Sequence, residues 1–155
     1  MPSFKATGMY LEDYVPGQGK LSPGRTINSA DIDMFAEWCE NPSLAKRFGP
    51  DGRREVSAQL IVNLADALFQ RMGCVEGTGY CNLGWTWEFK RPLYEYDTMW
   101  VQASWNTTRK SRSHPGVGIV NMTLDLLNQR DEIFAVADWT CMVLSRSSPP
   151  KWLAA

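Results

Sequence analysis

The sequence predicts an α+β domain in which an antiparallel sheet wraps around one long central helix. Two observations lead to this prediction. Apolar residues recur at helical spacing from Ser57 to Met72, and after Gly73 the sequence reads as strand after strand. One well-formed helix before a set of strands is typical of a sheet that buries its apolar face against that helix.

The central helix has clear start and stop signals. Ser57 is suited to cap its start, and Gly73 is suited to end it. One face carries Leu60, Ile61, Leu64, Ala65, Leu68 and Met72, and the other carries Gln59, Asn63, Asp66 and Gln70. We therefore expect the apolar face to form the core of the domain.

A shorter helix is expected from Ser29 to Cys39. Asn28 starts this segment, and Asp31 can help to satisfy the first-turn amides. Pro42 ends the helical pattern. Residues 20–27 before it are a strand candidate, and the polar segment 40–54 after it is expected to be a long surface loop, a kind of segment that is often functional.

Four strands are expected after the central helix, because apolar and polar residues alternate there. In the first strand, Cys81, Leu83, Trp85, Trp87 and Phe89 are expected to share one face. The strands are expected at Thr78–Phe89, Thr98–Asn106, Val117–Leu127 and Ile133–Leu144, with a polar, basic hairpin loop at Thr107–Pro115.

The whole chain of 155 residues is expected to form one domain, with a loose arm at residues 1–9 and an irregular tail at residues 146–155. The net charge of −1 gives no general attraction to nucleic acid or to an anionic membrane. The beginning lacks an apolar signal core, and no apolar run is long enough to cross a bilayer. We therefore expect a cytoplasmic protein with no nucleic-acid or membrane partner.

Cysteine and tryptophan usage adds two expectations. The four cysteines have no close paired spacing and lie far from the single histidine, His114, so we expect free thiols and no metal site. The seven tryptophans fit the faces of a small sheet or an interface. Since one small sheet does not bury so many aromatics and its own edges, we expect a homodimer or a larger even oligomer.

Several short segments follow one another in a characteristic order between about Tyr10 and Arg146. They are residues 26–36 (TINSADIDMFA), Asn41-Pro42, residues 89–94 (FKRPLY) with Asp97-Thr98, residues 109–113 (RKSRS), residues 118–120 (GIV) and Asn128-Gln129. In this order they resemble the MaoC-like dehydratases of the hot-dog fold, which include the (R)-specific enoyl-CoA hydratases. The resemblance implies a strongly curved antiparallel sheet around a central helix, usually paired with a second sheet in a dimer.

The resemblance also implies a ligand, an acyl thioester of coenzyme A or of acyl carrier protein, and no other cofactor. In the family an Asp and a His activate water for hydration of the enoyl double bond. The family motif reads Gly-Asp-x-Asn-Pro-x-His, and its alignment on Asn41-Pro42 puts Cys39 at the Asp position and Leu44 at the His position. The usual acid–base pair is therefore absent. Tyr96 stands where the family has a Gly before Asp97.

The resemblance and the residue chemistry together indicate a small set of site residues. The predicted catalytic residues are Glu40, Asn41, Ser57 and Gln59, and the cations predicted to bind coenzyme A phosphates are Arg109, Lys110 and Arg112. Glu40 is one position from the Asp slot, and Ser57 opens a helix whose free amides can polarise a carbonyl. Asp66 and Glu55 are the second choice for a carboxylate base.

Each of these residues also has a purely structural interpretation. Ser57 can simply cap a helix, and the polar helix face can be solvated or face a dimer partner. The basic run can be a solvated loop, and Glu40 can be an exposed loop carboxylate.

Three functions are therefore compatible with the sequence. The first is an enoyl-thioester hydratase or dehydratase with a degenerate active site. The second is a non-catalytic thioester-binding subunit of a two-chain dehydratase, and the third is a hot-dog thioesterase. The missing histidine favours the second function on chemical grounds.

Overall fold

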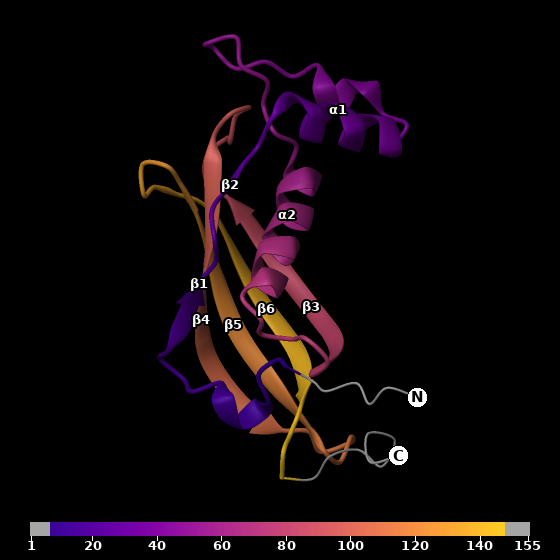
Figure 1. Cartoon of the computed structure of the whole chain (residues 1–155), viewed down its shortest axis with the longest axis vertical. Helices are drawn as coiled ribbons and strands as arrows, with labels where there is room; N and C mark the ends of the chain where they lie inside the picture. The colour runs from indigo at the N-terminus through magenta and orange to yellow at the C-terminus, as the bar shows by residue number, and fades with distance from the viewer. Residues whose placement is uncertain (1–6, 148–155) are drawn as a thin grey trace.

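The computed structural model describes residues 7–147, and Figure 1 shows one curved antiparallel sheet with a helix lying across its hollow side. The strands are β1 (Gly19–Leu21), β2 (Arg25–Thr26), β3 (Gly79–Phe89), β4 (Thr98–Lys110), β5 (Val117–Asn128) and β6 (Ile133–Leu144). The helices are α1 (Ser29–Trp38) and α2 (Ala58–Arg71), with short 3₁₀ turns η1 (Leu11–Asp13) and η2 (Pro42–Ala45). The strand order is β1-β4-β5-β6-β3, and β2 also pairs with β4.

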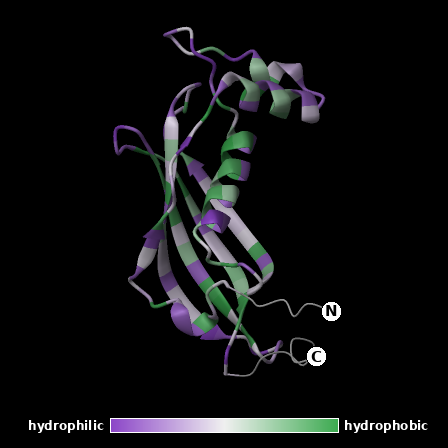
Figure 2. Cartoon of the chain, in the orientation of Figure 1, coloured by the Kyte–Doolittle hydropathy of each residue, from purple (hydrophilic) through white to green (hydrophobic). Residues whose placement is uncertain are grey.

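The predicted central helix is confirmed as α2. Ser57 caps it, since its Oγ accepts a hydrogen bond from the Leu60 amide at 3.3 Å. The face that contacts the sheet is apolar, as Figure 2 shows by its colour, and the buried residues of α2 are Leu60, Ile61, Ala65, Leu68 and Phe69. Burial of a large apolar side chain contributes about 1.5–3 kcal/mol, so this face dominates the stability of the domain.

The structure adds one residue, Phe69, at a flank of the predicted apolar face. Phe69 is fully buried, and its ring meets Trp139 edge-on at a centroid distance of 4.6 Å and Trp105 at 6.4 Å. The sheet is so strongly curved that it encloses the helix from two sides. The curved sheet therefore buries a wider stripe of α2 than a flat sheet would bury.

The shorter helix begins as predicted. Asn28 Oδ1 accepts from the Asp31 amide at 3.2 Å, and Asp31 Oδ2 accepts from the Asn28 amide at 2.9 Å. Cys39 caps the end of α1 and is not part of it. The single strand expected at residues 20–27 is divided into β1 and β2, because Pro23 lacks an amide for pairing.

Two strand boundaries differ from the prediction. The segment expected to be a hairpin loop from Thr107 continues β4 as far as Lys110, which pairs with Gly118. A register shift between Trp105 and Thr107 breaks the alternation there, so the polar end of the strand had the pattern of a loop. In β3 another shift, between Asn82 and Gly84, interrupts the row of side chains expected on one face.

Residues 28–56 leave the sheet and return to it, and two arginines hold this excursion in place. Arg54 donates to both carboxylate oxygens of Glu95, at 2.9 and 3.2 Å, and also pairs with Asp33 on α1. Arg53 donates to Asp97 Oδ1 at 2.8 Å. Within the expected long loop lie η2 and a bridge between Phe48 and Arg54.

The two ends of the described chain are also tied to the domain. The amides of Gly8 and Met9 donate to the carbonyls of Glu76 and Cys74, at 2.8 and 2.9 Å. Arg146 forms two hydrogen bonds of 2.7 Å with Asp13. The remainder of the expected arm, residues 1–6, and of the expected tail, residues 148–155, lies outside the described residues.

The Arg54–Glu95 pair predicts a specific pH dependence of stability. Hydrogen bonds from Arg54 and Ser29 hold the pKa of Glu95 at about 2, below its ordinary 4.5. A carboxylate with a lowered pKa stabilises the fold above its ordinary pKa, and this contribution disappears as the pH falls toward its folded-state pKa. We expect Glu95→Gln to reduce the free energy of unfolding by about 2 kcal/mol at neutral pH.

The measurement is urea unfolding of both proteins from neutral pH downward. The difference between them should shrink below about pH 4.5 and approach zero near pH 2. Glu37→Gln, at an exposed position on α1, serves as the control and should stay within about 0.5 kcal/mol of the native chain. A difference between Glu95→Gln and the native chain that is independent of pH would contradict the assigned ion pair.

Candidate functional site

The start of α2 presents unpaired backbone amides. The Ser57 hydroxyl accepts from the Leu60 amide, and the Ser57 carbonyl accepts from the Ile61 amide at 3.1 Å. Within residues 7–147, the amides of Ala58 and Gln59 have no hydrogen-bond partner. These two donors lie at the positive end of the helix dipole, so they can stabilise negative charge on a carbonyl oxygen.

A cavity of about 480 Å³ adjoins this helix start. Ala58 and Ile61 of α2 and Phe89 at the end of β3 contribute apolar surface to it. Its rim carries three cations, Arg47, Lys90 and Arg91. The cavity therefore combines an apolar wall, the helix start at Ala58, three cations and the carboxylate of Glu55.

The three rim cations differ in how they are held. Arg47 pairs with Glu55 at 3.1 Å, and Arg91 pairs with Glu132 at 2.9 Å. The Lys90 ammonium has no ion-pair partner within the described part of the chain, so it is the freest of the three to meet an anion.

Sequence analysis did not select these cations. Lys90 and Arg91 belong to the segment FKRPLY, which carries the resemblance, and Arg47 lies in the expected surface loop, so none of the three is among the predicted phosphate-binding cations. The signal that could have found them is their place in the chain, because the turn after β3 returns to the start of α2. The amide of Val56 donates to the carbonyl of Leu93 at 2.8 Å, which brings the two segments together.

The predicted phosphate-binding cations lie elsewhere in the chain. Arg109 and Lys110 end β4, where they face Ile119 and Gly118, and Arg112 follows in the turn. The start of α2 lies near the opposite end of the sheet, where β4 begins at Thr98 (Figure 1). At about 3.3 Å per residue, β4 is roughly 40 Å long, so these cations and the α2 start do not share one site within a single chain.

Glu40 and Asn41 occupy a third place, at the end of α1. Glu40 has a left-handed backbone with φ of 49°, and its side chain lines a shallow depression with Asp33 and Lys46. Asn41 caps η2, since its Oδ1 accepts from the Ser43 amide at 3.3 Å. Neither residue lines the cavity at the start of α2.

The other predicted site residues also lie at several different places in the fold. Cys39, at the Asp position of the motif, is exposed, and Leu44, at the His position, is half-buried. Gln59 is exposed on the first turn of α2, and Glu55 lines the cavity there as the partner of Arg47. Of the predicted site residues, Glu55 alone is in the lining of this cavity, and Ser57 lies between the lining residues Val56 and Ala58.

Asp66 lines a second cavity of about 390 Å³, between the later turns of α2 and β3. Its walls include Trp85 and Trp139, whose rings stack at a centroid distance of 5.0 Å. Gln70 donates to Asp66 at 2.9 Å, and burial raises the pKa of the Cys141 thiol to about 12. This cavity is therefore mostly apolar, and the Cys141 thiol stays protonated near neutral pH.

Tyr96 has a left-handed backbone with φ of 68°, at the position where the resemblance expects glycine. Residues other than glycine rarely adopt this backbone conformation, so the turn carries local strain. The Tyr96 amide donates to the Ile27 carbonyl at 2.7 Å, and its hydroxyl lies 2.9 Å from Ser29 Oγ. These bonds hold the turn against the start of α1.

Two kinds of feature are absent from residues 7–147. Within this range, no group of three or more His, Cys, Asp or Glu residues is placed to hold a metal ion. No helix in the same range has the length and apolar character needed to span a membrane.

Comparisons with known proteins identify the fold. No family model matches the sequence, and no curated protein matches it. The structure is similar to that of a MaoC-like dehydratase from Rhodospirillum rubrum, with a TM-score of 0.77 and 25% identity, covering 90% of this chain and 99% of that one. It is also similar to the R-hydratase PhaJ1 from Pseudomonas aeruginosa, with a TM-score of 0.72 and 19% identity, covering 90% and 88%.

A third similar structure is a conserved protein from Mycobacterium tuberculosis that has a double hot-dog fold. Its TM-score is 0.76 at 14% identity, and the match covers 92% of this chain and 46% of that one. The resemblance to MaoC-like dehydratases found in the sequence is thus confirmed in three dimensions. The chain has the hot-dog fold, and its structural relatives include MaoC-like dehydratases and (R)-hydratases.

Proposed function

We propose that this chain binds an acyl thioester, of coenzyme A or of acyl carrier protein, at the start of α2. One observation carries the proposal, namely that Ala58, whose amide is free, lines a cavity together with Arg47, Lys90 and Arg91. A thioester carbonyl accepts hydrogen bonds from such amides, and the phosphates of the carrier arm are attracted by such cations.

The same geometry supports binding without efficient hydration. Hydration needs one group to take a proton from water and another to protonate the α-carbon. Leu44 performs no proton chemistry, the exposed Cys39 follows the end of α1, and Glu40 lines a different depression. The proposed protein is therefore a thioester-binding hot-dog protein with a degenerate hydratase site.

Two alternative functions need different chemical groups. A non-catalytic subunit of a two-chain dehydratase would bind the thioester while its partner chain supplies the acid and the base. Among the described residues, the lining of the cavity at the α2 start contains neither an Asp nor a His, the pair that the family uses, and this favours the alternative. A hot-dog thioesterase would need a carboxylate at the thioester carbon, for which Glu55 and Asp66 are the candidates.

We further propose that two copies associate through β3. This strand is the last in the sheet order, and Tyr80, Leu83 and Phe89 on it are 41%, 51% and 41% exposed. A strand that pairs with its own copy about a two-fold axis must pair antiparallel. A double hot-dog fold in the Mycobacterium tuberculosis protein supports such a pairing of two units.

Antiparallel pairing has a consequence for the cations. It brings the β4–β5 hairpin end of one copy to the same end of the assembly as the α2 start of the other. In such a dimer Arg109, Lys110 and Arg112 can approach a thioester bound by the second copy, although they are far from the α2 start of their own chain.

Charge reversal tests the binding site. The triple variant Arg47→Glu, Lys90→Glu and Arg91→Glu should weaken binding of hexanoyl-CoA about tenfold or more at low salt, and the effect should shrink at high salt. Reversal of Arg109, Lys110 and Arg112 is the matched comparison, because it changes the net charge equally. Isothermal titration calorimetry measures both.

We expect both triple variants to bind more weakly, with the larger loss in the first. Unchanged affinity in the first variant would remove the α2 start as the binding site. Unchanged affinity in the second would remove the predicted role of Arg109, Lys110 and Arg112.

Activity is tested by crotonyl-CoA hydration. A positioned acid or base contributes about 10²–10⁴-fold, so the native chain should turn over at a very low rate or not at all. The double variant Cys39→Asp with Leu44→His restores both groups at the motif positions and should be faster than the native chain. Glu40→Gln shows whether Glu40 supplies any residual turnover.

A native rate typical of an ordinary hydratase, unchanged by Glu40→Gln, would contradict the degenerate site. Release of free coenzyme A thiol without hydration would indicate the thioesterase alternative.

Assembly is tested by light scattering at micromolar concentration, where we expect the mass of two copies or of a larger even number. Leu83→Lys puts a charge on the exposed edge and should raise the dissociation constant about tenfold or more. Leu21→Lys, on the opposite edge strand β1, is the control and should not change it. A native chain that is monomeric would refute the proposed pairing.

A further inference from the structure

A further cavity, of about 270 Å³, lies on the outer face of the sheet, the side turned away from α2. Leu21 of β1 is paired with Gln102 of β4, and Trp100 of β4 is paired with Leu127 of β5. Val101, between Trp100 and Gln102, is fully buried in the core, so its two neighbours point to the outer face. These four residues line the cavity together with Gln129 and Asp131.

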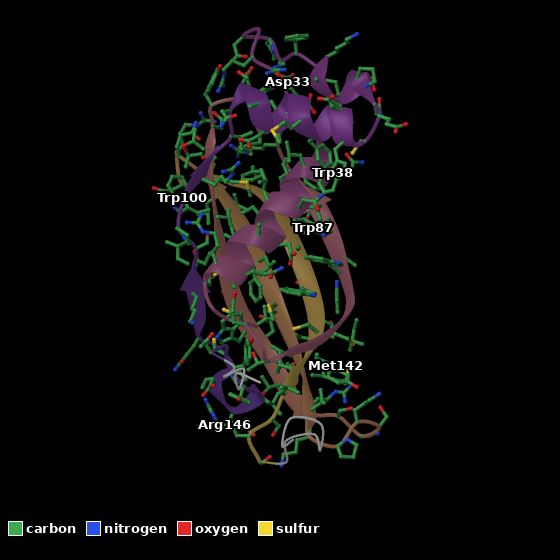
Figure 3. All side chains as sticks on the ribbon, turned by 45° about the vertical axis from the view of Figure 1, so that its right-hand side comes forward. Asp33, Trp38, Trp87, Trp100, Met142 and Arg146 are labelled. Atoms are coloured by element: carbon green, nitrogen blue, oxygen red, sulfur yellow. The ribbon has the colours of Figure 1, made fainter. Side chains whose placement is uncertain are left out.

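The indole of Trp100 is held in place from the side of β1 and β2. A Cβ atom on Gly24 would lie only 2.7 Å from the indole ring, so the bare backbone of Gly24 packs directly against it. Ser22 fixes this segment, because its amide donates to the Val101 carbonyl and its hydroxyl accepts from the Val101 amide, both at 2.9 Å. Figure 3 shows Trp100 at this edge, on the opposite side of the view from Trp87.

The turn after β5 supplies a carboxylate to the cavity. Gln129 fixes the turn, because its Oε1 accepts from the Thr98 amide at 3.1 Å. Asp131 follows with a left-handed backbone, at φ of 58°. Arg130 and Glu132 on either side of it pair with each other at 2.9 Å. The Asp131 carboxylate has no hydrogen bond or ion pair within residues 7–147, so a fixed turn presents a negative charge without a partner of its own.

The lining of this cavity is suited to a positive charge on an apolar stem. Among the described residues it contains an aromatic ring and a carboxylate but no Lys, Arg or His. The face of an indole attracts ammonium and guanidinium groups, and a carboxylate accepts hydrogen bonds from them. Leu21 and Leu127 provide apolar surface for the carbons that carry such a group.

We propose that this cavity binds an organic cation, an ammonium or guanidinium group on a short apolar chain. The Trp100 ring and the Asp131 carboxylate hold the charge, and Leu21 and Leu127 cover the chain. The volume is slightly below the usual range of small-molecule sites, so the cavity admits one such group and not a large ligand. The inference goes beyond the proposed thioester site, because this cavity shares no lining residue with the two cavities beside α2.

An NMR titration of isotopically labelled protein tests the choice of charge. Butylammonium is compared with butanol and butyrate, which carry the same chain with no charge and with a negative charge. The indole N–H signal of Trp100, identified by its loss in Trp100→Phe, should shift with butylammonium and not with the other two at equal concentrations. Equal shifts with butanol or butyrate, or shifts with butylammonium only elsewhere in the protein, would overturn the inference.

Variants test the two groups that hold the charge, with binding read from the backbone amides of β4. Trp100→Ala should weaken butylammonium binding about fivefold or more, and Trp100→Phe should retain part of the affinity. Asp131→Asn should weaken it about threefold at low salt and less at high salt. Glu88→Gln, at an exposed position on β3, removes the same charge and should have no effect. Equal losses in Asp131→Asn and Glu88→Gln, or unchanged affinity in Trp100→Phe and Asp131→Asn together, would overturn the inference.

The natural cation can be a free amine or a side chain of another protein. Stronger binding of N-acetyl-arginine amide than of butylguanidinium indicates a protein side chain, and the reverse order indicates a free small molecule. Binding of neither overturns the inference. Hexanoyl-CoA affinity should be the same in the native chain and in Asp131→Asn, so a failure at this cavity and a failure of thioester binding are separate results.

Discussion

The burial of α2 in the hollow of the sheet is the constraint on which the rest of the structure depends. Ala65, Leu68 and Phe69 are completely or almost completely buried, and their neighbours come from every long strand of the sheet. A helix held along one whole face cannot slide or rotate without opening cavities, at a cost of several kcal/mol per large residue. Its two ends are therefore fixed, and so are the amides that begin it.

The second constraint concerns the 28–56 excursion, from which Ile32 and Val56 join the buried core. Charged side chains hold it, with Arg54 between Glu95 and Asp33, and Arg53 on Asp97. Glu95 and Asp97 are 8% and 3% exposed, so each would be costly to bury without its partner. Burial raises the pKa of Asp97, but hydrogen bonds from Arg53, the Tyr94 amide and Gln129 together outweigh it, so the pKa is lowered. A well-ordered excursion thus follows from paired charges, and it carries α1 to the edge of the sheet.

Sequence reasoning predicted the parts of the fold that periodicity controls. The stripe of α2, the cap at Ser57 and the reciprocal cap between Asn28 and Asp31 are local patterns, and the structure shows all of them. The errors in the predicted elements occur where the regular spacing of apolar residues is interrupted or does not match the buried surface. A register shift after Trp105 made the end of β4 resemble a loop, and curvature of the sheet buried Phe69 on a flank of the helix that a flat sheet would have left exposed.

The candidate site was predicted less completely, for a physical reason. Which charges share a cavity depends on contacts between segments far apart in the chain, such as the bond from the Val56 amide to the Leu93 carbonyl. No periodicity encodes that contact. Arg109, Lys110 and Arg112 were conspicuous as a cluster in the sequence, whereas Lys90 and Arg91 adjoin the helix start only after β3 has returned to it.

The fold and the chemistry of this chain depend on different residues, which explains how one persists without the other. The helix start is maintained by the core beneath it, and its free amides are backbone groups that every replacement except proline leaves in place. The acid and the base of a hydratase would be side chains on the excursion, whose anchors, Arg53 and Arg54, do not involve positions 39 or 44. Replacement there by Cys39 and Leu44 leaves the anchors intact. The proposed carbonyl binding at α2 is thus independent of the proton-transfer groups, so the proposed loss of hydration would leave the surface for a thioester unchanged.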